Sequence, residues 1–207
     1  MTVETVSKPF NQKKRLFIAQ LLGVSAILVL LVSEPSWKDM SLPQQAMESF
    51  GTLLVLVCMI GRLWATLFVG SRKNVELVTT GPYSVTRNPL YLFSTIGLVG
   101  LGLVFGSIII TVILAALSYL VLAVTARKEA AFLRQRFADE YLAYEKRTPQ
   151  FWPDPRLYSS PDEVTFSPEL LGRAFRDTLY FLLLIPVIGA VGHLHDMGYL
   201  PVLLRIP

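Results

Sequence analysis

A polar turn between two apolar runs carries the side chains best suited to chemistry in this sequence. It reads Gly81-Pro82-Tyr83-Ser84-Val85-Thr86-Arg87-Asn88-Pro89-Leu90-Tyr91. The Gly-Pro and Asn-Pro pairs break helical backbone, because proline fixes its own φ and disfavours the helical region for the residue before it. Between the breaks lie one guanidinium and two phenols. Crossing a bilayer requires none of these groups, so we expect the chemistry to lie here.

A second polar segment, residues 127–169, carries paired acids beside tyrosines. At 100° per residue, five of its residues form one apolar stripe along a helix. The stripe consists of Ala130, Leu133, Phe137, Tyr141 and Tyr144. Glu129 and Glu140 are about three helical turns apart, on the same border of that stripe. An amphipathic helix on the membrane surface would show the stripe, but it would not require two aligned acids.

The elements that position these segments are membrane helices. Of the 207 residues, 53% are hydrophobic and 16% are charged, whereas soluble domains carry about 25% charged residues. The net charge of +4 comes from Lys and Arg scattered at segment ends, which favours membrane topology and lipid contacts over nucleic acid. The single cysteine, Cys58, lies inside an apolar run, so no disulfide framework exists.

Five crossings are the simplest interpretation of an all-α chain with a single domain, 1–207. The first apolar run is near the ~20 residues that span a bilayer. One later run is too long for a single crossing, and Gly106-Ser107 divides it into a helical hairpin. The runs are 16–32, 50–69, 91–126 and 178–191. The transmembrane core is therefore expected over 16–126 and 178–191, and the polar segments 71–91 and 127–169 flank the hairpin.

The basic residues predict the orientation of the chain. The N-terminus, the 71–90 turn and the 127–176 segment are rich in Lys and Arg, and the loop after the first crossing is net acidic. By the positive-inside rule, the N-terminus and both polar segments are cytoplasmic and the C-terminus lies outside. We expect a bacterial or archaeal inner membrane, with the two polar segments close together on the cytoplasmic face.

Together the two segments resemble the isoprenylcysteine carboxyl methyltransferase and phospholipid methyltransferase superfamily, over about residues 77–153. The first shared motif is Gly-Pro-Tyr, three variable residues, Arg-His-Pro and a tyrosine, with Asn88 in the histidine's place. The second contains an acidic pair, a leucine and Phe-Gly-x-Glu-Tyr-x-x-Tyr. In this chain Ala130 replaces the second acid of the pair and Ala138 replaces the glycine. A run beginning Arg62-Leu63-Trp64 also looks familial.

The resemblance implies methyl transfer from S-adenosylmethionine at the cytoplasmic membrane boundary. The implied cofactor-binding residues are Gly81, Pro82, Tyr83, Arg87, Asn88, Pro89, Tyr91, Glu129, Glu140, Tyr141 and Tyr144. Carboxylates suit the ribose diol or the ammonium group of this cofactor, tyrosine rings suit its adenine or its cation, and the proline-broken backbone is expected to leave amides and carbonyls free for it.

Arg87 and Glu129 are the expected catalytic residues. A guanidinium can orient an anionic acceptor, and a carboxylate can take the proton that an amine acceptor must lose. Arg62 and Trp64 are the expected substrate-binding residues, because an ionisable group deep in a membrane is costly unless it has a function. No metal site is expected: His193 and His195 do not share a helical face, and the glycines at 97, 100 and 102 suit close helix packing.

The partners implied are membrane lipids and a lipid or prenylated amphiphile as methyl acceptor. A prenylated cysteine carboxylate and a phospholipid amine both remain open as its reactive group. Two alternatives from other classes also remain. One is an NADPH-dependent membrane reductase of the sterol-reductase type, and the other is a non-enzymatic membrane scaffold or transporter.

Overall fold

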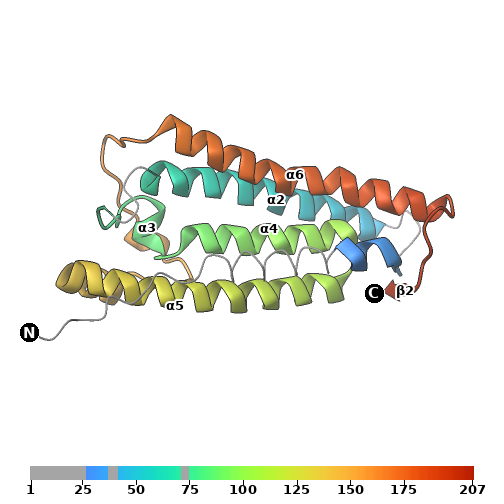
Figure 1. The fold of residues 1–207 in the computed structure, drawn as a ribbon, viewed down its shortest axis with the longest axis horizontal. Coiled ribbons are helices and arrows are strands. Elements are labelled where there is room, and N and C mark those ends of the chain that lie inside the picture. Colours follow the sequence, from blue (N-terminus) through green and yellow to red (C-terminus); the bar gives the residue numbers. More distant parts are fainter. Residues whose placement is uncertain (1–26, 37–41, 71–74) are drawn as a thin grey trace, which may run out of the picture.

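Four long helices lie side by side in the computed structural model, which describes residues 27–36, 42–70 and 75–207 (Figure 1). They are α2 (Leu42–Val69), α4 (Pro89–Phe105), α5 (Ile108–Arg147) and α6 (Pro168–Asp196). The shorter elements are β1 (Ser33–Pro35), α3 (Pro82–Val85), the 3₁₀ turn η1 (Pro155–Leu157) and β2 (Leu204–Ile206). The prediction of an all-α protein is confirmed, with one small strand pair added.

The helices have the composition and the surface of membrane-spanning elements. Three of them, α2, α5 and α6, are long and apolar enough to cross a bilayer, and α4 is a shorter apolar helix. Large hydrophobic side chains face outward, as at Val112, Leu120 and Val187, which fits a surface covered by lipid tails. The first predicted crossing lies outside the described residues except for 27–32, which are helical.

The hairpin between α4 and α5 begins and ends where the sequence predicts. Gly106 caps α4 with a φ of 84°, a left-handed conformation that glycine adopts without strain. Ser107 then starts α5, and its side chain accepts a hydrogen bond from the Ile110 amide. α5 has 40 residues with a break in the helix at Ala138; the part before the break is about 45 Å long at 1.5 Å per residue, longer than the ~30 Å hydrocarbon core. Its second half, which is polar, therefore extends beyond the membrane.

Glycines bring α2 and α4 into close contact at the centre of the bundle. A Cβ at Gly100 would lie 2.7 Å from the Gly51 carbonyl oxygen, and one at Gly97 would lie 2.5 Å from Cys58 Sγ. The expectation that these glycines serve helix packing is confirmed, because small residues let membrane helices approach closely.

A strand pair closes the end of the bundle opposite the 81–91 turn. β1 and β2 pair in parallel, with Ser33 opposite Leu204. Ser107 Oγ donates a hydrogen bond to the Pro207 carbonyl at 2.7 Å, and buried His195 lies with Nε2 3.0 Å from the Leu31 carbonyl oxygen. The tail after α6 is thereby attached to the start of α5.

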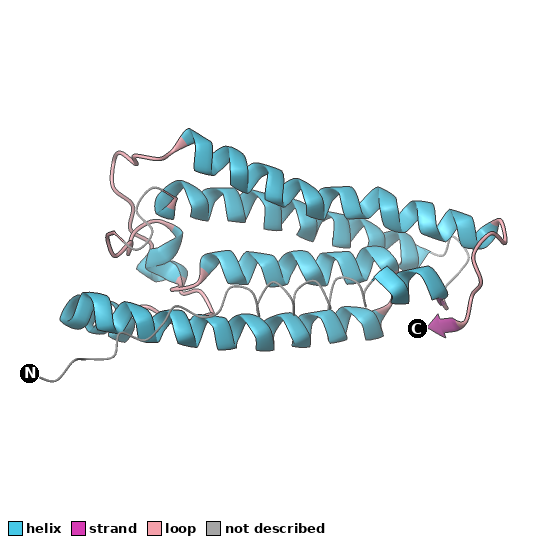
Figure 2. Cartoon of the chain, viewed as in Figure 1, coloured by secondary structure: helices cyan, strands magenta, loops and turns pink. Residues whose placement is uncertain are grey.

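The two polar segments meet at the other end, as the hairpin topology predicts (Figure 2). α2 ends there, α3 lies there, and α5 and the chain up to the start of α6 complete that end (Figure 1). The assignment of this end to the cytoplasm stays a prediction from the charge distribution.

Replacing Gly100 with alanine is expected to destabilise the bundle, because the new Cβ would overlap the backbone of α2. Overpacking of this kind costs about 1–3 kcal/mol. Thermal unfolding of purified protein in detergent measures the change. Gly189→Ala is the matched control, since nothing lies within 4 Å of its Cβ position and alanine favours a helix by about 1 kcal/mol. Equal unfolding temperatures for the two variants would contradict the packing assignment.

Candidate functional site

The 81–91 turn is a compact unit held by proline and glycine. Gly81 has a φ of 60°, and a Cβ there would lie 2.3 Å from the Phe68 ring, so both backbone and packing require glycine. Pro82 opens α3 and Pro89 opens α4, each at a position where proline's missing N–H costs no helical hydrogen bond. Gly81 and Pro82 therefore shape the turn.

The chain after α5 docks onto this turn through backbone groups. The Tyr144 hydroxyl donates to the Tyr83 carbonyl at 2.7 Å, and the Arg87 amide donates to the Pro149 carbonyl at 2.9 Å. The Val85 carbonyl accepts from the Asp154 amide at 2.9 Å. The expectation that proline breaks leave these groups free for a cofactor is wrong for these three, because residues 144–154 already satisfy them.

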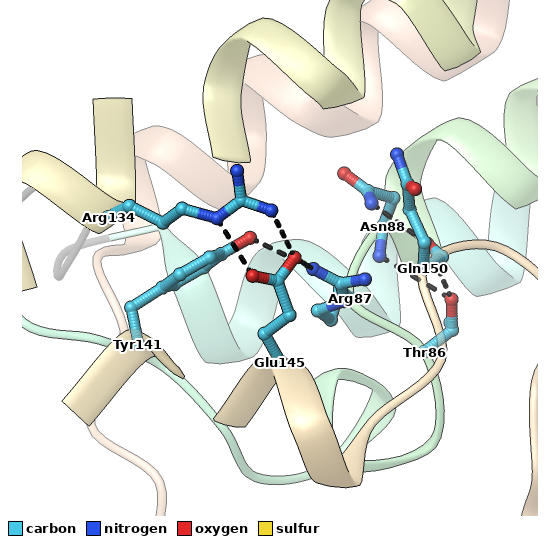
Figure 3. A network of polar contacts seen from close by, with 7 residues as sticks. All are labelled: Thr86, Arg87, Asn88, Arg134, Tyr141, Glu145 and Gln150. Atoms are coloured by element: carbon cyan, nitrogen blue, oxygen red, sulfur yellow. Dashed lines mark hydrogen bonds and ion pairs between the residues drawn. The ribbon is translucent and has the colours of Figure 1, made fainter. Parts of the chain in front are cut away.

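Asn88 takes part in the same docking through its side chain. Its Nδ2 donates to the Gln150 carbonyl at 2.8 Å (Figure 3). Thr86 Oγ1 donates to the Phe151 carbonyl at 3.1 Å. A side-chain amide here joins the two segments. Asn88 also lines the cavity described below.

A sharp reversal of the chain inside α5 brings residues 139–147 back toward the 81–91 turn. Ala138 has φ 39° and ψ −116°, the one non-glycine residue with positive φ in the described chain. As a result Arg134 and Glu145, eleven residues apart, form hydrogen bonds of 2.8 Å. The predicted stripe residues do pack together, but through this reversal rather than along one straight helix. The same reversal separates Glu129 from Glu140, so their predicted alignment is wrong.

Arg87 and Glu145 form the central ion pair of this end (Figure 3). Arg87 Nη1 donates to Glu145 Oε1 and to the Tyr141 hydroxyl, the latter at 3.2 Å. Arg134 holds the same carboxylate through Nε and Nη2, both at 2.8 Å. One carboxylate therefore joins two guanidinium groups. Arg87 Nε is buried without a hydrogen-bond partner.

These contacts determine the charge states on the polar side of the site. The hydrogen bond from Arg134, together with Arg87, lowers the pKa of the Glu145 carboxyl below its usual range. Burial raises the pKa of the Tyr141 phenol, which Arg87 partly offsets, and raises that of Tyr83 well above its usual value. At neutral pH the site therefore holds ionised Glu145 and neutral phenols.

A partly open cavity of about 130 Å³ lies between the 81–91 turn and α5. Its walls combine the two polar segments with the residues that follow α2. They are Val69, Glu76, Leu77, Val78, Tyr83, Arg87, Asn88, Pro89, Leu90, Tyr91, Ala126, Glu129, Ala130, Leu133, Tyr141 and Tyr144. Inside it, the Tyr91 hydroxyl donates to Glu129 Oε2 at 2.8 Å. This bond gives the Glu129 carboxylate a partner inside the cavity.

Several predicted site residues lie elsewhere. Glu140 is exposed and does not line the cavity. Arg62 lies within the bundle, where Nη1 donates to Ser94 Oγ and the guanidinium lies 5.9 Å from the centre of the Phe181 ring. The Trp64 ring lies 6.1 Å from that of Tyr158. Neither Arg62 nor Trp64 lines the cavity.

Sequence reasoning missed Glu145 and the wall formed by residues 76–78. Glu145 directly follows Tyr144, but a straight helix would direct it away from Arg87. Only the reversal at Ala138 brings it there, and an alanine at the position of a family glycine was the available signal. Among the described residues, no three His, Cys, Asp or Glu side chains form a group that could hold a metal.

Similarity to known proteins places the chain in a family of membrane proteins. Residues 47–140 match the phospholipid methyltransferase family, and the chain belongs to the isoprenylcysteine and phospholipid methyltransferase superfamily. It is 35% identical over 184 residues to the nickel-cobalt-cadmium resistance protein NccN of Alcaligenes xylosoxydans xylosoxydans, covering 89% of this chain and 86% of that protein. It is 32% identical over 191 residues to the cobalt-zinc-cadmium resistance protein CzcN of Cupriavidus metallidurans, covering 92% and 88%. No solved structure matches.

Ala138→Gly is expected to stabilise the protein, because glycine relieves the strained backbone at φ 39°. A strained backbone residue costs on the order of 1–3 kcal/mol, so the unfolding temperature in detergent should rise. Ala131→Gly, at an exposed helical position of the same helix, is the control and should lower it by the helix cost of glycine, about 1 kcal/mol. A fall in both variants would refute the strained turn.

Glu145→Gln is expected to cost stability near neutral pH and nothing in acid. A carboxylate whose pKa is lowered on folding stabilises the fold above its ordinary pKa and loses this effect as pH falls through the lowered value. The pair is partly solvated, with 21% of the Glu145 side chain exposed, so we expect about 1 kcal/mol. Unfolding temperatures of both proteins from pH 7 to pH 3 measure it; a gap that persists unchanged at pH 3 would contradict this charge state.

Proposed function

We propose that the chain transfers a methyl group from S-adenosylmethionine to an amphiphilic acceptor at the membrane boundary. The observation that carries the proposal is the cavity. Its lining contains Glu129, which accepts a hydrogen bond from Tyr91, together with Arg87 and three further tyrosines. Family membership supports methyl transfer, and the carboxylate, guanidinium and phenol groups of the cavity are types of group that can bind this cofactor.

The donor set fits the cofactor group by group. The Glu129 carboxylate can accept hydrogen bonds from a ribose diol or an ammonium, and the Tyr83 and Tyr144 rings offer faces for an adenine or a sulfonium. Arg87 Nε, buried without a partner, is a donor suited to the cofactor's carboxylate. The cavity is smaller than the ~300–1,000 Å³ of common ligand pockets, so a bound cofactor would extend through its open side.

The chemistry needs positioning more than acid–base catalysis. The cofactor supplies the methyl group from its sulfonium: the S–CH₃ bond breaks with its electrons left on sulfur, while a lone pair of the acceptor forms the new bond to carbon. The cavity walls orient the reactants and exclude water around them. A carboxylate acceptor needs no base. An amine acceptor must lose a proton, and Glu129 is the carboxylate in the cavity that we assign to take it.

The acceptor is proposed to be lipid-like, with a carboxylate or an amine as its reactive group. Lipid-facing helices surround the cavity end, so an amphiphile can reach it from the bilayer. Arg62, within the bundle, and Trp64 are proposed as contacts for such an acceptor. NccN and CzcN carry metal-resistance names, and we propose the same physiological setting for this methyl transfer.

Titration calorimetry with S-adenosylhomocysteine tests the proposal on purified full-length protein in neutral detergent. We expect binding to the wild type and weakening by about 10-fold or more in Glu129→Gln, because a charge-assisted hydrogen bond contributes about 1.5–3 kcal/mol. Glu169→Gln is the control: this carboxylate is 82% exposed on α6 and pairs with Arg173, one turn along the same helix. A protein that binds NADPH and does not bind S-adenosylhomocysteine would refute the proposal in favour of a reductase.

A further inference from the structure

A second hollow lies on the other side of the Arg87–Glu145 ion pair. It is an open groove of about 450 Å³, built mainly from the end of α5 and the chain that follows. Its lining consists of Arg87, Glu145, Lys146, Arg147, Thr148, Pro149, Trp152, Asp154 and Leu157. Arg87 lines both the groove and the cavity. Arg87 therefore borders both a partly enclosed space and an open one.

The lining of the groove carries a net positive charge, because Arg87, Lys146 and Arg147 outnumber the carboxylates of Glu145 and Asp154. Glu145 is already paired with Arg87 and Arg134, and Asp154 Oδ1 accepts a hydrogen bond from the Arg156 amide. Lys146 and Arg147 are exposed, and neither forms an ion pair within the described part of the chain. Two exposed cations in the lining of the groove attract an anionic group.

The groove also opens beside the lipid-facing surface. Trp152 is 72% exposed, and its neighbour Phe151 packs edge-on against Tyr119 of the apolar half of α5, with ring centres 5.0 Å apart. Tyr119 is itself 40% exposed, next to exposed Leu120. Tryptophan and tyrosine in such positions are typical of the membrane–water interface. A ligand in the groove can therefore keep its apolar part on α5.

We propose that this groove binds the anionic head group of an amphiphile, with Lys146 and Arg147 as the contacts for its charge. The role assigned to it rests on the proposed methyl transfer: the cavity holds the cofactor, the groove holds the acceptor's anionic group, and the acceptor's reactive group reaches into the cavity beside Arg87, which lines both spaces. An anion in the groove can share the Arg87 guanidinium with Glu145, since a guanidinium has five donors and Arg87 lines the groove as well as the cavity.

The test uses the full-length protein in neutral maltoside detergent and three probes. Dihexanoyl phosphatidic acid represents an anionic amphiphile, dihexanoyl phosphatidylcholine a zwitterionic one, and inorganic phosphate a free anion. We expect phosphatidic acid to bind more tightly than either of the others, and its affinity to fall about 10-fold in the double variant Lys146→Gln/Arg147→Gln. The variant Arg173→Gln/Arg176→Gln removes the same charge from exposed positions on α6 and should bind like the wild type.

Three results would overturn the groove assignment. They are equal affinities in the two double variants, tighter binding of phosphatidylcholine, and binding of inorganic phosphate as tight as that of phosphatidic acid. S-Adenosylhomocysteine titration of the same proteins separates this proposal from the proposed function. Cofactor affinity should be unchanged in Lys146→Gln/Arg147→Gln. Loss of cofactor binding in every protein, with lipid binding intact, would refute methyl transfer and leave the head-group site standing.

Discussion

The structure depends on satisfying the backbone polar groups of a turn at the edge of a membrane. The Gly-Pro and Asn-Pro pairs interrupt helical hydrogen bonding in the segment of chain that connects α2 to α4. Unsatisfied N–H and C=O groups are costly where water is scarce. The chain after α5 supplies the partners, through the Tyr144 hydroxyl, the Pro149 carbonyl and the Asp154 amide. A segment about 60 residues later in the sequence is thereby fixed against the turn, and the cavity is the space left beside this contact.

The reversal at Ala138 makes that contact possible. Without it, α5 would carry Tyr141 and Tyr144 away from the bundle along a helix of about 60 Å. With it, the same tyrosines return to the Arg87 guanidinium and the Tyr83 carbonyl. A strained alanine persists because the surrounding hydrogen bonds and the Arg134–Glu145–Arg87 bridge determine the local path of the chain. Strain at one residue thus accompanies the assembly of the whole site.

The sequence predicts those parts of this architecture that depend on local signals. Gly106 and Ser107 mark the hairpin because each suits a helix terminus, and apolar run lengths predict the membrane helices. The pairing of the two polar segments follows from the topology of that hairpin. The position of Glu145 and the exposure of Glu140 could not be predicted, because a period of 3.6 residues assumes a straight helix. The groove beside Trp152 depends on the same reversal at Ala138, and no short sequence motif predicts the groove.

An experimental structure of the full-length protein with S-adenosylhomocysteine tests the central claim most directly. The account predicts ligand density between Glu129 and the 81–91 turn, with the ligand's hydroxyls or ammonium on the Glu129 carboxylate and the Arg87–Glu145 pair on its far side. Density for this ligand at another place, with the space between Glu129 and the turn empty, would contradict it.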